Sequence, residues 1–161
     1  MKTAFLSLIL GFLLISHSNG QALKIVDLEK IFKQSNDNMD TFLAAKGFEF
    51  EETRSRGGDW GDCEELTYML HRSEGDGEIL SREICSDGSM LLDYTIFDTK
   101  AYSTIKQSLG ANGFVFVKQE SLEDLLIFNY KKGKLYLSLS SRKGETYIAY
   151  EISFQNEEFW N

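Results

Sequence analysis

The chain repeats part of its own sequence, and this internal repeat limits the fold more than any other feature. The segment Lys46–Phe50 (KGFEF) recurs 66 residues later as Asn112–Phe116 (NGFVF), each time after a helical pattern and at the start of a predicted strand. Three later segments of strand character match in the same order: 66–70 with 125–129, 79–84 with 135–140, and 91–96 with 147–152. Two copies are too few for a solenoid, so the repeat predicts a duplicated unit that forms one domain.

The two copies differ in length. The offset between them is 66 residues at the Gly-Phe motif and 56 at the last strand, so the first copy carries about ten extra residues. The Gly-rich stretch 54–62 is the simplest place for this insertion. We therefore expect a single domain over residues 21–161, made of repeats 21–97 and 98–161.

The first copy opens with a helical pattern whose apolar residues recur near the 3.6-residue period. We predict Asp27 as its N-cap, and we expect the polar cluster 35–38 to divide the pattern into two short helices. Asp37 would cap the second helix, with Asp40 in its first turn. Gly47 stands at the C′ position, where a left-handed backbone is favourable.

The second copy follows the same plan. Asp98 is the predicted N-cap of a helix that ends at Gly113. The segments after each helix are bounded by turn-forming pairs and alternate only partly between apolar and polar residues. Such partial alternation is typical of a sheet with one face under helices and the other in water. The sequence therefore predicts an α+β fold with an antiparallel sheet of about eight strands and helices on one face.

Residues 1–20 have the pattern of a signal peptide rather than of a folded segment. Lys2 precedes the apolar run Ala4–Ile15, and Ser18 and Gly20 provide small residues at a cleavage site. The apolar run has 12 residues, whereas a membrane-spanning helix needs ~20. We expect an exported protein, periplasmic or extracellular, with no membrane span after cleavage.

Cys63 and Cys85 are the only two cysteines, and both lie in the predicted domain. In an oxidising compartment we expect them to pair. If 64–71 and 78–85 form a hairpin centred on Glu74, residues whose numbers sum to 148 face each other. Cys63 and Cys85 satisfy this sum and would be direct cross-strand neighbours. A disulfide closing this 22-residue separation would add on the order of 3 kcal/mol.

Composition excludes several functional classes. The chain contains no proline, which excludes a polyproline ligand segment. Its formal charge of −8 argues against nucleic acid as a partner, since such binding requires a basic surface. After loss of Lys2, residues 21–97 hold 8 basic and 17 acidic side chains, whereas 98–161 hold 8 of each. This one-sided field would steer a protein with a basic surface, although solubility alone also explains it.

The insertion 54–62 is the best candidate for recognition. Its glycines would make it mobile, and Trp60 is of the residue type most enriched at binding hot spots. An alternative is that Trp60 folds back over the sheet edge or over the disulfide. The candidate contact residues are Arg54, Arg56, Asp59, Trp60 and Asp62.

Signatures of an enzyme or a metal site are weak. Ser103 and Lys106 have the Ser-x-x-Lys spacing, but the motifs that accompany it in penicillin-binding enzymes are missing. His71 stands at a predicted strand end, where a surface histidine is the simpler interpretation. The acidic segments 59–65 and 74–78 lack the ligand order of an EF-hand. We therefore predict no catalytic residues, no metal and no cofactor.

The order of elements, with two short helices, a Gly-Phe strand opening and a meander in each copy, resembles the tandem architecture of the β-lactamase inhibitor protein family. The chain also resembles uncharacterised small exported proteins of Bacteroidetes-type bacteria in its signal peptide and its KGFEF segment. The resemblance implies an exported binding domain and supplies no activity.

Our first hypothesis is an exported non-enzymatic binding domain, inhibitor- or immunity-like, that contacts a basic protein through the acidic first repeat and the 54–62 loop. A second hypothesis is a carrier of a small apolar ligand between sheet and helices. A third is a small hydrolase that uses His71 or Ser103. The meander would leave two open sheet edges, so either a monomer or an edge-paired dimer is compatible with it.

Overall fold

The computed structural model describes residues 22–58, 61–72, 77–122, 125–144 and 146–157. The helices are α1 (Ile25–Lys33), α2 (Asn36–Ala45), α3 (Thr99–Ser108) and the 3-10 turn η1 (Gly110–Asn112). The strands are β1 (Glu49–Gly58), β2 (Gly61–Leu70), β3 (Glu78–Cys85), β4 (Met90–Ile96), β5 (Val115–Leu122), β6 (Leu125–Lys132), β7 (Leu135–Lys143) and β8 (Ile148–Asn156). The predicted signal peptide lies outside the described residues.

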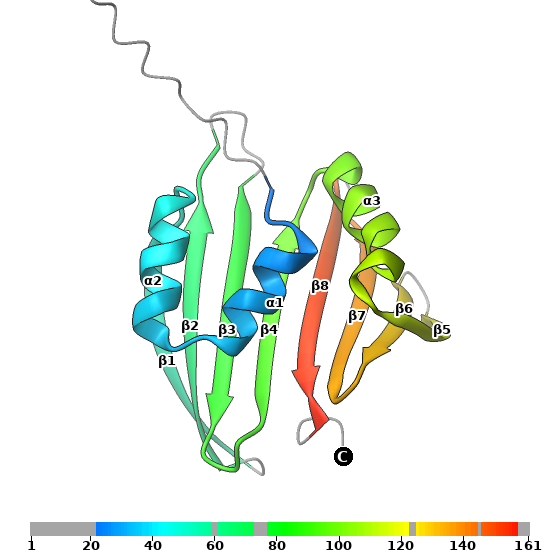
Figure 1. The fold of residues 1–161 in the computed structure, drawn as a ribbon. Helices are drawn as coiled ribbons and strands as arrows, with labels where there is room; N and C mark the ends of the chain where they lie inside the picture. Colours follow the sequence, from blue (N-terminus) through cyan, green and yellow to red (C-terminus); the bar gives the residue numbers. More distant parts are fainter. Residues whose placement is uncertain (1–21, 59–60, 73–76, 123–124, 145, 158–161) are drawn as a thin grey trace, which may run out of the picture.

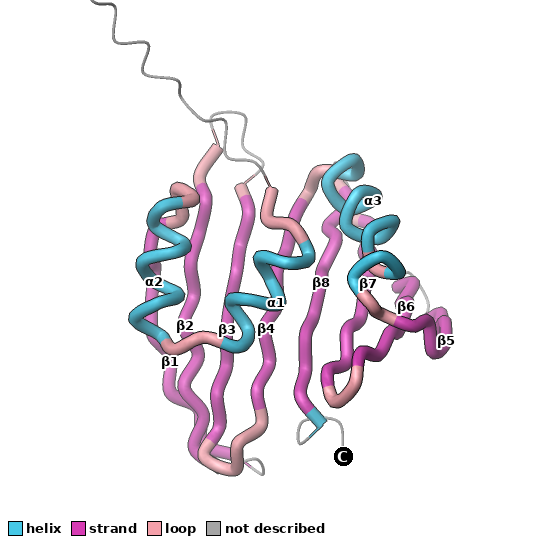
Figure 2. The backbone as a smooth tube through the Cα atoms, viewed as in Figure 1, coloured by secondary structure: helices cyan, strands magenta, loops and turns pink. Residues whose placement is uncertain are grey.

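The eight strands form one antiparallel sheet with the order β1-β2-β3-β4-β8-β7-β6-β5. Each half is a four-strand meander, and the two meanders join where β4 pairs with β8. Helices α1 and α2 cover the first half of the sheet and α3 covers the second, all on the same face (Figures 1 and 2). The predicted α+β class with helices on one face of an open antiparallel sheet is confirmed.

The helix ends agree with the sequence predictions only in part. Asp98 caps α3 as predicted, because its carboxylate accepts the backbone N–H groups of Lys100 and Ala101 at 2.7 and 3.2 Å. Asp27, by contrast, is the third helical residue of α1, where its carboxylate accepts the backbone N–H of Lys24 at 3.1 Å. Similarly, Ser35 rather than Asp37 precedes α2. Both helices begin earlier than predicted, because these acidic side chains favour the first turn as well as the cap.

The core lies between the helices and the covered face of the sheet. Alternate residues along each strand point into it, as the period of two requires. The chain contributes fully buried side chains from both halves: Leu28, Ile31, Met39, Leu43, Leu80, Leu92, Tyr94, Ile96, Ile152 and Phe154. No helix in the described part of the chain is long and apolar enough to cross a membrane.

The two halves share local detail at the offset of the repeat. Gly47 and Gly113 both adopt a left-handed backbone, with φ of 89° and 83°. The register of the edge strand shifts after Phe50 in β1 and after Phe116 in β5, as a β-bulge does. These are features that a duplicated unit would share, and the duplication itself stays a prediction.

The predicted hairpin register is confirmed. Cys63 pairs with Cys85 and Leu70 with Glu78, so facing residues sum to 148. The two cysteines form a disulfide, and their Cα atoms lie 3.9 Å apart.

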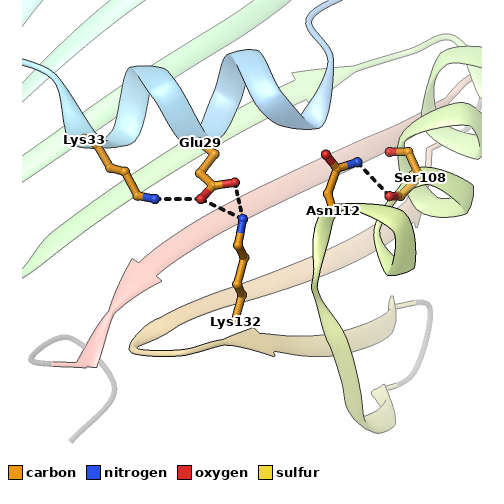
Figure 3. Close-up of polar contacts among 5 residues, drawn as sticks. All are labelled: Glu29, Lys33, Ser108, Asn112 and Lys132. Carbon is orange, nitrogen blue, oxygen red and sulfur yellow. Dashed lines mark hydrogen bonds and ion pairs between the residues drawn. The ribbon is translucent and has the colours of Figure 1, made fainter.

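Polar contacts of Arg82 and Glu29 are among those that tie the helices to the sheet. Arg82 points from β3 into the core and donates hydrogen bonds to the carbonyl oxygens of Ile31 and Gln34 at 3.0 and 2.7 Å. Glu29 on α1 binds the ammonium group of Lys132, at the end of β6, with N–O distances of 2.8 and 2.9 Å (Figure 3). The second contact joins the first half of the chain to the second.

Candidate functional site

The helices leave the opposite face of the sheet uncovered in the described chain (Figures 1 and 2). One residue from each strand contributes to a row across this face, and each member is paired with the next by the strand register. The polar row consists of Glu52, Thr67, Ser81, Asp93, Ser153, Ser138, Asn129 and Lys118. Every member is polar, which distinguishes this face from the apolar covered face.

Asp93 lies at the centre of the polar row, where β4 meets β8. The Ser153 hydroxyl donates a hydrogen bond to its carboxylate at 2.5 Å and also lies 3.1 Å from a carboxylate oxygen of Glu151. Burial, together with the negative charges of Glu151, Glu65 and Glu83, raises the pKa of Asp93 to about 6 despite the hydrogen bond from Ser153. Asp93 forms no ion pair with any cation among the residues that the structure describes.

Three glutamates of the uncovered face act on Asp93, and we call the four carboxylates the acidic cluster: Glu65, Glu83, Asp93 and Glu151. Glu65 and Glu83 are directly opposite each other on β2 and β3. Arg56 reaches both, at 2.7 Å from Glu65 and 3.8 Å from Glu83, and so offsets part of their charge. The cluster is therefore compensated on its β1 side, whereas no cation of the described residues forms an ion pair with Asp93 or Glu151.

The other end of the uncovered face is different in character. Lys131 donates a hydrogen bond to the Tyr136 hydroxyl at 2.7 Å, and Lys118 ends the polar row. A pocket of about 290 Å³ opens there, lined by Val117, Lys118, Asn129, Tyr130, Lys131, Tyr136, Leu137 and Ser138. The uncovered face is thus acidic over the first half of the sheet and carries lysines over the second.

The predicted recognition loop 54–62 is largely a β-hairpin, which corrects the sequence prediction. Arg54 belongs to β1, and β2 begins at Gly61, so both arms are paired strand. Arg54 and Arg56 face the uncovered side of the sheet. Asp62 is the residue before Cys63 on β2, so its side chain points to the other side. Among the described residues, the hairpin therefore places Arg54 and Arg56 on the opposite side of the sheet from Asp62.

The two arginines of this hairpin are engaged within the chain. Arg54 pairs with Glu52 at 2.5 Å, and Arg56 pairs with the acidic cluster. Asp59 and Trp60 lie outside the described residues.

The acidic cluster lies on the strands, outside the insertion 54–62 in which the sequence predicted the contact residues. A signal for it was present: the register that pairs Cys63 with Cys85 also pairs Glu65 with Glu83, since both sums are 148. The pairing of Asp93 with Ser153 had no such signal, because it depends on how the two meanders meet.

The structure does not bring the two candidate catalytic residues together. His71 is exposed beyond the end of β2, and its Nε2 atom lies 3.2 Å from an oxygen of Glu51. Ser103 lies on α3, over the other half of the sheet (Figure 1). Glu83 lies close to both cysteine sulfurs, but the disulfide engages these sulfurs and leaves no thiolate to bind a metal.

No family model matches the chain, and no curated protein or solved structure shows significant similarity to it. The resemblance to inhibitor-like repeats therefore stays a prediction. Support for a function comes from the geometry of the uncovered sheet face.

Proposed function

We propose that this chain is an exported, non-enzymatic binding domain whose acidic cluster receives the basic surface of a protein partner. The observation that carries the proposal is Asp93, a carboxylate with a raised pKa at the centre of an uncovered sheet face. Keeping it ionised at neutral pH destabilises the folded state, and proteins retain such groups chiefly at functional sites. A lysine or arginine from a partner would supply the missing counter-charge.

Long-range electrostatics support the same partner. The acidic excess of the whole chain lies in residues 21–97, which also contribute three of the four carboxylates of the acidic cluster. Such a one-sided field accelerates the approach of a cationic protein and orients it. An inhibitor- or immunity-type role would use this kind of contact.

Export is supported by two further features. Residues 1–20 have the order of a signal peptide, and the chain contains a disulfide between Cys63 and Cys85. Disulfides of this kind persist in oxidising compartments.

The experiment is affinity capture from the envelope and medium of the native producer. The test variant is Glu65→Gln/Glu151→Gln, which neutralises two carboxylates of the acidic cluster. The matched control is Glu64→Gln/Asp37→Asn, which removes the same amount of charge outside the acidic cluster. Glu64 is exposed and points to the other side of β2 from Glu65, and Asp37 lies on α2. We expect the wild type and the control to retain a basic protein that the test variant loses. Equal recovery by all three proteins would refute the acidic cluster as the contact surface.

The carrier hypothesis has less support. In the described chain, apolar side chains fill the space between helices and sheet, and the pocket near Lys131 opens on the other face. The hydrolase hypothesis, which used His71 or Ser103, stays a prediction: His71 is exposed beside Glu51, and Ser103 lies on α3.

A further inference from the structure

The sheet has two open edges with different chemistry. The first edge, β1, carries the charged side chains Glu49, Glu51, Glu52, Arg54 and Arg56. Charges of this kind are a common protection against edge-to-edge pairing. The second edge, β5, has only two charged residues, Lys118 and Glu120.

Nearly all side chains of β1 are exposed, Phe50 among them at 56%, and so are those of β5. The apolar members of β5, Val115, Phe116, Val117 and Leu122, expose 69%, 51%, 54% and 62% of their surface. An exposed apolar edge strand is a template for another strand. The difference between the edges therefore points to β5 as the one that accepts a partner.

The charge order of β5 selects the occupant. Two copies of β5 can pair antiparallel across a twofold axis perpendicular to the sheet. Residues that face each other then point to the same side of the sheet, so their residue numbers add up to an even value. A sum of 236 would place Lys118 against itself, and a sum of 240 would place Glu120 against itself. A sum of 238 places Lys118 against the partner's Glu120, twice, with Gln119 on the axis.

The same register brings the apolar ends of the two strands next to each other. Leu122 of each copy lies beside the Phe116–Val117 bulge of the other, with Leu122 on the uncovered side and Phe116 on the covered side because the register shifts at the bulge. In each copy Lys118 and Glu120 already form an ion pair at 3.0 Å, so both side chains extend on the same side of β5.

We propose that a second copy of this chain pairs with β5 across a twofold axis at Gln119, joining two eight-stranded sheets into one. This dimer leaves β1 open and keeps the helices of both copies on one side. The acidic cluster lies in and beside the opposite half of the sheet from β5, so the dimer is independent of the proposed function. It would present two acidic clusters on one continuous face.

Charge exchange tests the register directly. Sedimentation of the mature protein over a dilution series should show a monomer–dimer equilibrium for the wild type. Lys118→Glu or Glu120→Lys alone places like charges opposite each other twice and should weaken association by about tenfold. Mixing the two variants, or combining both changes in one chain, restores opposite pairs and should restore the dimer. Thermal unfolding of each variant shows whether the monomer is intact.

A covalent readout complements this. Gln119→Cys should give a disulfide-linked dimer on mild oxidation, since residues opposite each other on an antiparallel pair are within disulfide reach. Ser55→Cys, exposed on β1, is the matched control and should not cross-link. A wild type that stays monomeric at the highest concentration would overturn the proposal and leave β5 to a strand of another protein or to none. Folded single charge variants that dimerise as strongly as the wild type would also overturn it.

Discussion

Asp93 and Ser153 face each other where the two meanders join, and the Ser153 hydroxyl donates a 2.5 Å hydrogen bond to the Asp93 carboxylate. The two residues are 60 positions apart in the chain. Their contact places an acidic group at the middle of the uncovered face, three strands away from edge strand β1 and four from edge strand β5. Neighbouring strands on both sides exclude water there, which is the main reason for the raised pKa of Asp93.

The first prediction concerns Asp93 and pH. Its folded pKa of about 6 lies above the unfolded value of ~3.9. The folded state therefore binds this proton more tightly than the unfolded state does. The stabilisation of the fold by the protonated Asp93 is fully present below about pH 4 and is lost as the pH rises through about 6. Glu65, Glu83 and Glu151 also act on this carboxylate and raise its pKa, whereas the hydrogen bond from Ser153 lowers it.

We expect Asp93→Asn to be more stable than the wild type at neutral pH by on the order of 2 kcal/mol, with the gap closing towards about pH 4. Urea unfolding of both proteins at several pH values measures the gap. Asp37→Asn on α2 is a control for general charge effects. A gap that is the same at acidic and neutral pH would contradict the raised pKa.

The second prediction concerns the ion pair between α1 and β6 (Figure 3). Burial acts to raise the pKa of Glu29, but hydrogen bonds from Lys132 and Lys33 outweigh it and lower that pKa. A double-mutant cycle of Glu29→Gln and Lys132→Met should give a coupling of about 1 kcal/mol at neutral pH. Because the folded pKa is lowered, the coupling should vanish as the pH falls through it.

The neighbouring pair within α1 provides a comparison. Lys33 lies one helical turn from Glu29, and its side chain is 61% exposed. A cycle of Glu29→Gln and Lys33→Met should give only about 0.3–0.5 kcal/mol. If the Lys132 cycle gives no more than the Lys33 cycle, the link between the two halves contributes nothing beyond a surface pair.

The third prediction concerns Arg82. Its guanidinium group is buried and binds the carbonyl oxygens of Ile31 and Gln34 at the end of α1 and the side chain of Asn36 at the start of α2. Arg82→Ala should destabilise the fold by about 3 kcal/mol or more, because it leaves a cavity and unbonded carbonyl groups. Chemical denaturation measures the loss, and Arg54→Ala on the exposed edge should change the stability little. A tolerated Arg82→Ala would mean that water replaces the guanidinium group.

The fourth prediction concerns the disulfide. Replacing Cys63 and Cys85 by serine should lower the free energy of unfolding by on the order of 3 kcal/mol, since the bond closes a 22-residue separation. The same loss should follow from adding a reductant to the wild type. The serine variant is the control for the reductant and should not respond to it. A reductant effect without a matching mutant effect would point to a different cause.

Several elements could be predicted because their causes are local. Glycine at residues 47 and 113 permits the left-handed backbone after each helical region, and the caps and turn pairs set where strands begin. The sum of 148 predicted the disulfide because two strands of one hairpin keep a single register along their length. The exact helix starts at Asp27 and Asp37 were wrong, since an acidic residue is stabilised both at the cap and in the first turn.

The sequence by itself determined the class of fold, two meanders with helices on one face, and the pairing of Cys63 with Cys85. Periods of 2.0 and 3.6 residues and short turns are properties of neighbouring residues, so they can be read along the chain. Only the tertiary structure decided that Asp93 meets Ser153, that Glu29 meets Lys132 103 residues away, and that β5 rather than β8 forms an edge. The alternation of apolar and polar residues along a strand is the same for every possible order of the strands in the sheet. The burial of a shared core therefore selects the order that forms.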